Sequence, residues 1–246
     1  MNFVELSKYL QRLEKTSSRL ALTQILAELY KRSDTEEIDK ITYLLLGRLA
    51  PSYKAIIFNI ADRMMIRVLA KAYGEDIEKV KTAYRKKGDL GEVAYDLSQK
   101  SKSKRQTYEV VDVYNQLLVV AREGGEESQE RKVSGMATLL FSLDPLSVRF
   151  VTRIPLGRLR LGFSDKTILD ALSWMERGNK SGRAMLTRAY EVLPDVGLLA
   201  KVVKEKGIEK ASKNVTPIVG VPVMPMLAQR LKSPKEMIAK MGKVAV

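Results

Sequence analysis

One loop of the sequence combines the residue types that bind a sugar-phosphate backbone. In "PLGRLRLGFSDKT", Gly157 and Gly162 flank Arg158 and Arg160. Glycines allow a backbone to come close to a ligand, and in an extended segment the two arginines point the same way. Ser164 follows as the expected cap of a helix whose free N–H groups would form a second phosphate site. The loop therefore favours contacts to phosphates.

Two other predicted helix starts join a small hydroxyl residue to a basic residue. An ordinary helix cap would have the same pattern in each case, but three such starts together favour phosphate contacts over capping alone. The residues in "EKTSSRL" are Thr16, Ser17, Ser18 and Arg19, and those in "EESQERK" are Ser128, Arg131 and Lys132.

Three stretches carry positive charge without acids to neutralise it in the sequence. Each Lys or Arg that meets a phosphate releases a condensed counterion, so such runs suit a polyanion, although each run alone is more typical of an ordinary solvated surface. The runs contain Lys100, Lys102, Lys104 and Arg105; Arg149, Arg153, Arg158 and Arg160; and Arg177, Lys180, Arg183 and Arg188.

The composition excludes most hydrolytic and metal chemistry. The 246 residues hold 43 Lys plus Arg against 29 Asp plus Glu, a formal charge of +14, which favours a polyanionic partner. There is no Cys and no His, so disulfides, thiolate or imidazole metal sites and Ser-His or Cys-His catalytic pairs are excluded. The share of apolar residues, 45%, is sufficient for a buried core.

The acidic residues give no sign of catalysis. The pairs Glu36/Glu37 and Glu126/Glu127 fall in predicted helix first turns, where the helix dipole accounts for them. The sequence has no G-x-x-x-x-G-K-[ST] phosphate loop. It also has no signal-peptide pattern at its start and no uncharged run of membrane-spanning length, which predicts an intracellular protein.

The elements that position these residues are predicted to be helices. Apolar residues recur at helical spacing, and alternating strand patterns are almost absent before residue 215. Four of the eight prolines fall in 217–234, so 215–228 is expected to be extended, followed by a short helix at 233–241 and a strand in "KVAV". The expected helices cover 22–29, 38–49, 53–72, 75–86, 89–99, 108–122, 127–143, 145–153, 164–176, 180–193 and 195–206.

An internal repeat predicts two related halves. "AYRKKGDLGEVA" and "AYEVLPDVGLLA" match at Ala-Tyr, Asp, Gly and Ala, and their aspartates, Asp89 and Asp195, are 106 positions apart. "LGRL" occurs at 46–49 and again at 156–159. The fold class is therefore expected to be all-α, with about twelve helices in two halves that pack about a pseudo-twofold axis.

Several motifs resemble one known family. "KKGDLGEVA", "ESQERKVSGMATLLF", "LGRLRLGFSDKTILDALS", "LPDVGLLAKVV" and "VGVPVMPMLAQRLKSPKEMI" resemble, in this order and over essentially the whole chain, the DNA-binding domain of ATP-dependent DNA ligases of the archaeal and eukaryotic replicative type. The resemblance implies an all-helical domain of two pseudo-symmetric halves. It also implies that this domain encircles nicked DNA, together with an adenylation domain and an OB-fold domain, and holds the minor groove without reading sequence.

The resemblance also implies where the chain stands in a longer protein. A segment like "PVMPMLAQ" begins the adenylation domain in this family, and a strand like "KVAV" runs into a Glu-x-Lys-x-Asp-Gly motif whose lysine is adenylylated. No Asp-Gly dipeptide occurs in this chain. We therefore expect a helical DNA-binding domain at 1–214, and at 215–246 a linker with the first elements of an adenylation domain truncated before its nucleophile. The longer protein would use ATP and Mg²⁺, and this part would use no cofactor and have no catalytic residue.

The resemblance places DNA contacts where the residue types had placed them. The family's contacts match Thr16 to Arg19, then Ser128, Arg131 and Lys132, and then the loop from Gly157 to Gly162. The family usually has a Gly-rich turn after a "P-x-Y" resembling Pro51 to Tyr53, which "IIFNIADRM" replaces here. Some archaeal members carry a sliding-clamp motif with Gln and two adjacent aromatics near "RQTYEV", where only Tyr108 is aromatic, so the clamp is disfavoured as a partner.

The sequence therefore predicts sequence-independent binding of nicked double-stranded DNA. The expected DNA-binding residues are Thr16, Ser17, Ser18, Arg19, Lys102, Lys104, Arg105, Ser128, Arg131, Lys132, Gly157, Arg158, Arg160, Gly162 and Ser164. The alternative is a basic helical-repeat scaffold that binds an acidic protein partner with its basic loops as rim charges.

Overall fold

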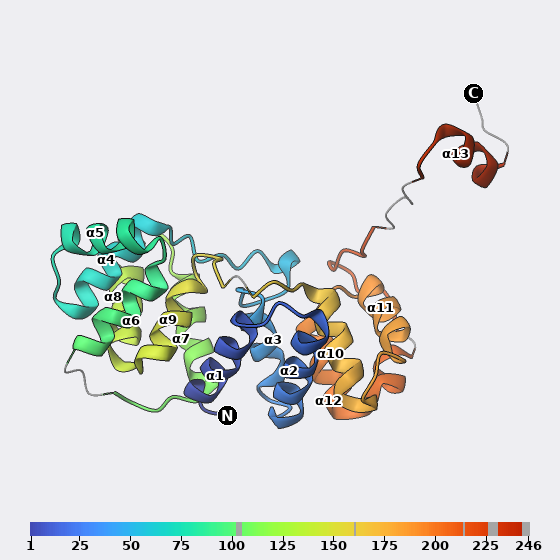
Figure 1. Ribbon diagram of the computed structural model, residues 1–246, viewed down its shortest axis with the longest axis horizontal. Coiled ribbons are helices and arrows are strands. Elements are labelled where there is room, and N and C mark those ends of the chain that lie inside the picture. The colour runs from blue at the N-terminus through green and yellow to red at the C-terminus, as the bar shows by residue number, and fades with distance from the viewer. Residues whose placement is uncertain (102–104, 160, 214, 226–230, 243–246) are drawn as a thin grey trace.

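Helices build the whole described part of the protein (Figure 1). The computed structural model describes residues 1–101, 105–159, 161–213, 215–225 and 231–242. Within these ranges there are thirteen α-helices and one short 3₁₀ helix, η1 (Ser52–Lys54), and the only strand-like pairing is an isolated bridge between Asn2 and Glu109. The all-α prediction is confirmed.

The helices form two lobes that take their elements alternately from the sequence (Figure 1). In both lobes the helix pairs that pack most closely join an early helix to a late one: α6 with α9 and α4 with α8, and α2 with α10 and α3 with α12. The first lobe contains α4 (Asp62–Tyr73), α5 (Ile77–Lys87), α6 (Leu90–Lys100), α8 (Ser128–Ser142) and α9 (Pro145–Arg153). The second lobe contains α2 (Arg19–Arg32), α3 (Ile38–Leu45), α10 (Asp165–Arg177), α11 (Arg183–Val192) and α12 (Val196–Ser212).

Two helices join the lobes. Helix α1 (Phe3–Glu14) contacts α9 and α2, and α7 (Val110–Arg122) contacts α8 and α3. The chain segments that lead into α1 and α7 run antiparallel and are joined by two backbone hydrogen bonds. The N–H of Phe3 donates to the Tyr108 carbonyl at 2.8 Å, and the N–H of Val110 donates to the Met1 carbonyl at 3.0 Å. The buried apolar side chains form one cluster through both lobes. The lobes therefore share a core.

Several contacts recur between residues about one repeat apart. The arginine of the first "LGRL", Arg48, pairs with Asp165 at the start of α10, and the arginine of the second, Arg158, pairs with Asp62 at the start of α4. The repeated aspartates, Asp89 and Asp195, both cap the helix that follows them. These reciprocal contacts are of the kind that duplicated halves require, and the pseudo-twofold arrangement itself stays a prediction.

Aspartate caps set several of the helix starts. Asp144 accepts hydrogen bonds from the N–H groups of Leu146 at 3.0 Å and Ser147 at 3.1 Å, with Pro145 at the first helical position. Asp89 accepts from the N–H of Glu92 at 3.0 Å. These bonds satisfy N–H groups that have no partner inside the helix, so they fix where the chain enters each lobe.

The structure corrects the predicted elements in three places. The helix expected at 53–72 begins only at Asp62, and after η1 the chain crosses between the lobes without regular structure. Helix α1 was not among the predicted ranges. The helix expected at 195–206 continues to Ser212 after a kink. Gly207 has a φ of 79° at the kink, and Glu176 accepts the hydrogen bond of the Ile208 N–H at 2.8 Å.

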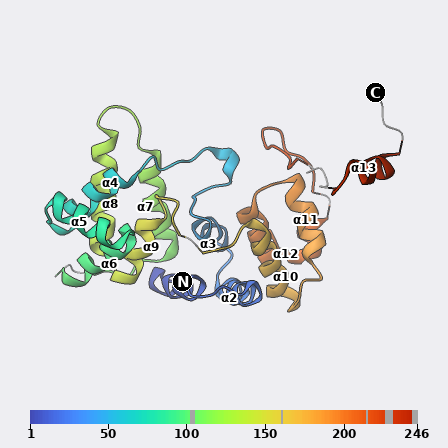
Figure 2. The ribbon, with the colours of Figure 1, turned by 45° about the horizontal axis from the view of Figure 1, so that its top comes forward.

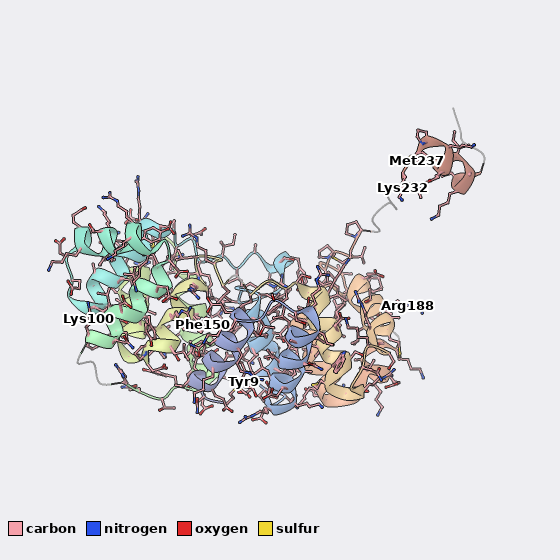
Figure 3. The ribbon with its side chains drawn as sticks, in the orientation of Figure 1. Tyr9, Lys100, Phe150, Arg188, Lys232 and Met237 are labelled. Atoms are coloured by element: carbon pink, nitrogen blue, oxygen red, sulfur yellow. The ribbon has the colours of Figure 1, made fainter. Side chains whose placement is uncertain are left out.

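The end of the described chain, 231–242, lies apart from the lobes (Figure 1), whereas the N–H of Met224 in the preceding segment donates to the Glu191 carbonyl of α11 at 2.8 Å. Residues 215–225 have no helix, as expected, and α13 (Pro234–Met241) begins after the cap residue Ser233 with Pro234 at its first position. Figure 3 shows Lys232 and Met237 on this separate segment, away from the body of the molecule. The strand expected in "KVAV" lies outside the described residues.

Candidate nucleic-acid interface

An open cleft of about 620 Å³ brings together two of the three predicted contact regions. Its lining comes from the start of α2, the loop before α10 and the start of α11. Figure 2 shows the ribbons of α2, α10 and α11 in the second lobe. Arg19 comes from the first region, and Gly157, Gly162 and Ser164 come from the glycine-arginine loop. The other lining residues are Thr23, Leu45, Leu46, Gly47, Leu159, Leu161, Phe163, Lys166, Thr167, Asp170, Lys180 and Arg183.

The loop offers open backbone to this cleft. Gly157 has a φ of 63° and Gly162 a φ of 73°, values that residues with a side chain rarely adopt. Both glycines are exposed, and no heavy atom lies within 4 Å of the position that a Cβ would take on either one. A ligand backbone can therefore approach the main chain here, as the sequence predicted.

The start of α10 lines the cleft with Ser164, Lys166 and Thr167. Ser164 is the N-cap residue, as predicted, but its side chain makes no capping hydrogen bond. Its carbonyl accepts from the N–H of Thr167 at 2.9 Å. Helix N-termini carry unpaired N–H groups and a partial positive charge, so this end of α10, with Lys166 in its first turn, suits an anion such as phosphate.

An ion pair removes the negative charge that α10 would otherwise present. Asp165 opens the helix, and an unpaired carboxylate there would repel a phosphate. Its partner is Arg48, which follows the glycine Gly47 in the first "LGRL". Tyr190 of α11 lies against this pair, and burial, followed by the charge of Asp165, raises the pKa of its hydroxyl to about 12. The pair therefore leaves the helix terminus electrostatically open to an anion.

The start of α2 supplies the second wall of the cleft. Ser18 caps the helix, and its side chain accepts from the N–H of Ala21 at 3.4 Å. Arg19, the first residue of the helix, is exposed, as are Ser17 and Ser18. Thr16 donates its hydroxyl to the Arg12 carbonyl at 2.7 Å, so it stabilises the turn between α1 and α2. Arg19 is the cation of this region that faces the cleft.

Arg158 is not the free phosphate contact that the loop sequence predicted. Its guanidinium pairs with Asp62 at 3.0 Å and donates to the Tyr84 hydroxyl at 2.8 Å. The hydrogen bond to Tyr84, and then the one to Asp62, raise the pKa of Arg158. Because Asp62 opens α4, this contact ties the loop after α9 to the first lobe, and the adjacent glycine remains available to the cleft.

The third predicted region lies at a separate site. Ser128 is the first residue of α8, and the N-cap is Glu127, in left-handed conformation with φ of 56°. A cleft of about 550 Å³ contains Ser128 and Arg67 but also Glu127 and Glu130. The acids make this site less favourable for a polyanion than the cleft of the second lobe.

The basic residues of this third region have structural partners. Arg131 donates to the Glu123 carboxylate at 2.6 Å and to the carbonyls of Glu126 and Gly124, so it holds the turn between α7 and α8. Lys132 is buried, and its Nζ donates to the Phe58 carbonyl at 2.7 Å. We correct the assignment of Lys132: a buried ammonium bonded to the main chain does not reach a phosphate in this conformation.

Other parts of the sequence-based site fall outside the cleft or outside the described residues. Lys102, Lys104 and Arg160 belong to residues that the structure does not describe. Arg105 is exposed and does not line the cleft. It donates a hydrogen bond to the Ser98 carbonyl at 3.4 Å.

Acids distant in sequence neutralise much of the charge in the supposedly acid-free runs. Arg153 is buried and pairs with Glu14, Asp89 and Glu92, which lie 139, 64 and 61 positions away, and Arg149 pairs with Glu14 and Glu92. In the last run, Arg177 pairs with Glu209, and Figure 3 shows Arg188 on the outer side of α11. Arg149, Arg153 and Arg177 are therefore largely structural, whereas Lys180 and Arg183 of the last run line the cleft.

Sequence reasoning missed several lining residues of the cleft. Gly47 is in the repeated "LGRL", which was a signal of duplication but was not assigned to the site. Lys180 and Arg183 were noticed as a basic run without being assigned to the site, and Lys166 carries no motif of its own. No group of His, Cys, Asp or Glu that could hold a metal occurs among the described residues. No helix in the described ranges is long and apolar enough to cross a membrane.

Comparison with known proteins identifies one family. The family model described as "DNA ligase N terminus" matches residues 2–173. The chain is 39% identical over 247 residues to "DNA ligase 2" of Thermofilum pendens and 40% identical over 246 residues to "Probable DNA ligase" of Dictyoglomus thermophilum. It is 39% identical over 257 residues to "DNA ligase" of Saccharolobus solfataricus. These matches cover 96%, 100% and 100% of this chain, which spans 41%, 42% and 43% of the length of the three relatives.

Proposed function

Because the chain belongs to the DNA ligase N-terminus family, we propose that residues 1–214 form the DNA-binding domain of an ATP-dependent DNA ligase. This domain binds nicked double-stranded DNA through the sugar-phosphate backbone and the minor groove, and it does not read sequence. Its role is to hold and curve the duplex while catalytic domains close around the nick.

The cleft of the second lobe is the observation that carries this proposal. It combines two kinds of group that bind phosphate. One is the backbone at Gly157, Gly162 and the start of α10, and the other is the cations Arg19 and Lys166. Backbone and cationic contacts fix a protein on a duplex without distinguishing bases. The lining includes one aromatic residue, Phe163, and single-strand readers depend on several aromatic stacking platforms. A duplex backbone is therefore the ligand that the lining suits best.

For the longer protein, we propose the ligase reaction. A lysine would take AMP from ATP with release of pyrophosphate, and the AMP would pass to a 5′-phosphate at the nick. Attack of the 3′-hydroxyl on this phosphate would form the phosphodiester bond and release AMP, and Mg²⁺ would assist these steps. An adenylation domain and an OB-fold domain would perform these steps. Residues 215–246 would be the linker and the first elements of the adenylation domain, and the residues of this chain would bind no cofactor themselves. The DNA substrate would place the protein inside the cell.

The direct test is fluorescence anisotropy of a labelled nicked duplex over a salt series. Intact duplex, single strand and an unrelated polyanion serve as competitors. We expect salt-sensitive binding that is indifferent to sequence, with either duplex preferred to single strand and polyanion. Equal competition by every polyanion would favour the alternative, a basic helical scaffold for an acidic protein partner.

A further inference from the structure

One acidic side chain lies inside the basic cleft of the second lobe. Asp170 is on α10, lines the cleft and is 7% exposed. A carboxylate at this position opposes the binding of phosphate, because like charges repel more strongly where water is partly excluded. Its presence in the cleft therefore requires an explanation beyond the phosphate site itself.

Two cations of the cleft are held by this carboxylate. Oδ2 of Asp170 accepts a hydrogen bond from Nζ of Lys180 at 2.9 Å, and Oδ1 lies 3.2 Å from Nε of Arg183. The side chains of Lys180 and Arg183 are both 45% exposed, whereas that of Asp170 is 10% exposed. Each cation therefore has one side on the acid and the other side towards the open cleft.

The contact with Arg183 is incomplete. Oδ1 of Asp170 is buried and has no hydrogen bond, since the approach of Arg183 lacks hydrogen-bond geometry. Buried carboxylate oxygens are nearly always hydrogen-bonded, and one that is not carries a desolvation cost. Stability of the fold alone would favour either a well-formed pair or a neutral side chain here, so this arrangement points to a role in binding.

We propose that Asp170 is an internal competitor for the DNA phosphate and limits how tightly the cleft holds the duplex. This inference rests on the proposed function. In the free chain the carboxylate positions Lys180 and Arg183 at the wall of the cleft. A phosphodiester offers the same cations an anionic acceptor of the same type, so DNA binding must divide them between phosphate and Asp170. The bound duplex is consequently held less tightly than the count of basic residues suggests, which favours release after use.

The test compares Asp170→Asn with the wild-type chain in duplex binding over a salt series. The amide keeps the size of the side chain, removes the charge and frees one cation for a phosphate. One additional neutralised phosphate steepens the salt slope by about 0.9 and tightens binding by about 5–10-fold near 0.1 M salt. The matched control is Asp96→Asn on α6, which also loses an aspartate paired with a lysine, Lys87, and lies outside the cleft. We expect less than a twofold change for this control.

A second variant tests the proposal if circular dichroism shows that Asp170→Asn does not fold. This is the double variant Lys180→Gln/Arg183→Gln. Its salt slope should be flatter than that of the wild-type chain by clearly less than the amount expected for two lost phosphate contacts, because Asp170 already pairs with both cations. Equal or weaker binding by a folded Asp170→Asn, or a full loss of two contacts in the double variant, would overturn the inference while leaving the proposed function intact. If the wild-type chain does not bind duplex, the proposed function fails, and the inference fails with it.

Discussion

The cations of the second-lobe cleft differ in how much of their charge remains available to a ligand. Lys180 and Arg183 are held by Asp170, whereas Arg19 at the start of α2 and Lys166 in the first turn of α10 are exposed. A cation that already has a carboxylate partner gains less from a phosphate. Arg19 and Lys166 are therefore the residues from which the largest individual contributions to DNA binding are expected.

We expect Arg19→Ala to weaken duplex binding by about 1–2 kcal/mol, equally for all sequences, and to flatten the salt slope by about one unit. The reason is the loss of one phosphate contact that releases a counterion. Anisotropy titrations on two unrelated duplexes over a salt series measure both effects.

The matched control for this change is Arg32→Ala. Arg32 is on the same helix, about 20 Å away at its other end, and pairs with Glu5 on the surface. It should leave the slope unchanged. A loss that depends on the base sequence, or equal losses for both variants, would contradict a backbone contact by Arg19.

Lys132 should behave as a structural residue. We expect Lys132→Ala to lower the free energy of unfolding by about 1–3 kcal/mol, because it removes a charged donor and leaves the buried Phe58 carbonyl without its hydrogen bond. Urea unfolding measures this. The salt slope of duplex binding should not change at temperatures where the variant is folded. An exposed lysine, Lys79 of α5, provides the comparison, and Lys79→Ala should change stability by less than about 0.5 kcal/mol.

At the residue scale, the sequence predicted the glycines and the helix caps better than the cations. Gly157, Gly162 and Ser164 are local features, because a turn or a helix start depends on neighbouring residues. The availability of Arg158 or Lys132 depends on Asp62 and Phe58, which are 96 and 74 positions away. A stretch without acids in the sequence is therefore not a stretch without acids in space.

At the scale of elements, the packing of α6 against α9 depends on a buried charge cluster. Asp89 caps α6 and also pairs with Arg153 of α9, which Glu14 of α1 contacts as well. Gly91 is required beside them, because a Cβ there would lie 2.6 Å from Nε of Arg153 and 2.7 Å from the Arg149 carbonyl oxygen. The cluster thus fixes three helices relative to one another.

This cluster should make the protein sensitive to acid. Burial alone would raise the pKa of Asp89, but the hydrogen bond and charge of Arg153, together with the N–H groups of Glu92 and Gly91, lower it below the ordinary value of an aspartate. A carboxyl with a lowered folded-state pKa contributes stability that is present above the unfolded pKa and is lost as the pH falls through the folded value. The contribution of Asp89 is therefore lost below about pH 4.

We expect Asp89→Asn to destabilise the protein by about 1–3 kcal/mol at pH 7 and by less at pH 2, because the wild-type carboxyl loses its charge as the pH falls through its lowered pKa. Urea unfolding at the two pH values measures the difference. Asp76→Asn, at the exposed cap of α5, should have a small effect at both. A destabilisation by Asp89→Asn that does not shrink with falling pH would show that the charge of Asp89 is not the cause.

The sequence predicted most helices because their apolar spacing is a local property. The prediction was wrong for 55–61, where Ile56 and Ile60 have helix-like spacing. In the structure this segment is not helical; it crosses between the lobes, and the side chains of Phe58 and Ile60 are buried. An extended segment between two lobes can have the same apolar residues, at the same spacing, as a helix that packs on one lobe. The difference lies in the tertiary structure, so periodicity alone could not distinguish them.

At the scale of the whole molecule, the lobes are built from interleaved parts of the chain. α2 packs on α10 and α3 on α12, whereas α8 packs on α4 and α9 on α6. The repeat in the sequence predicted related halves, but it carried no information on whether each half packs with itself or exchanges helices. One consequence is functional: the cleft contains residues as far apart as Arg19 and Arg183 only because α2 packs on α10.

Hydrogen–deuterium exchange of the chain with and without a nicked duplex tests most directly whether this cleft holds DNA. The account predicts slower exchange at 16–23, at 161–170 and at the start of α11, with little change at the exposed face of α5 and at the turn between α7 and α8. The result that would contradict it is protection at the α7–α8 turn or on α5, with the cleft unprotected, under conditions in which anisotropy shows the duplex to be bound.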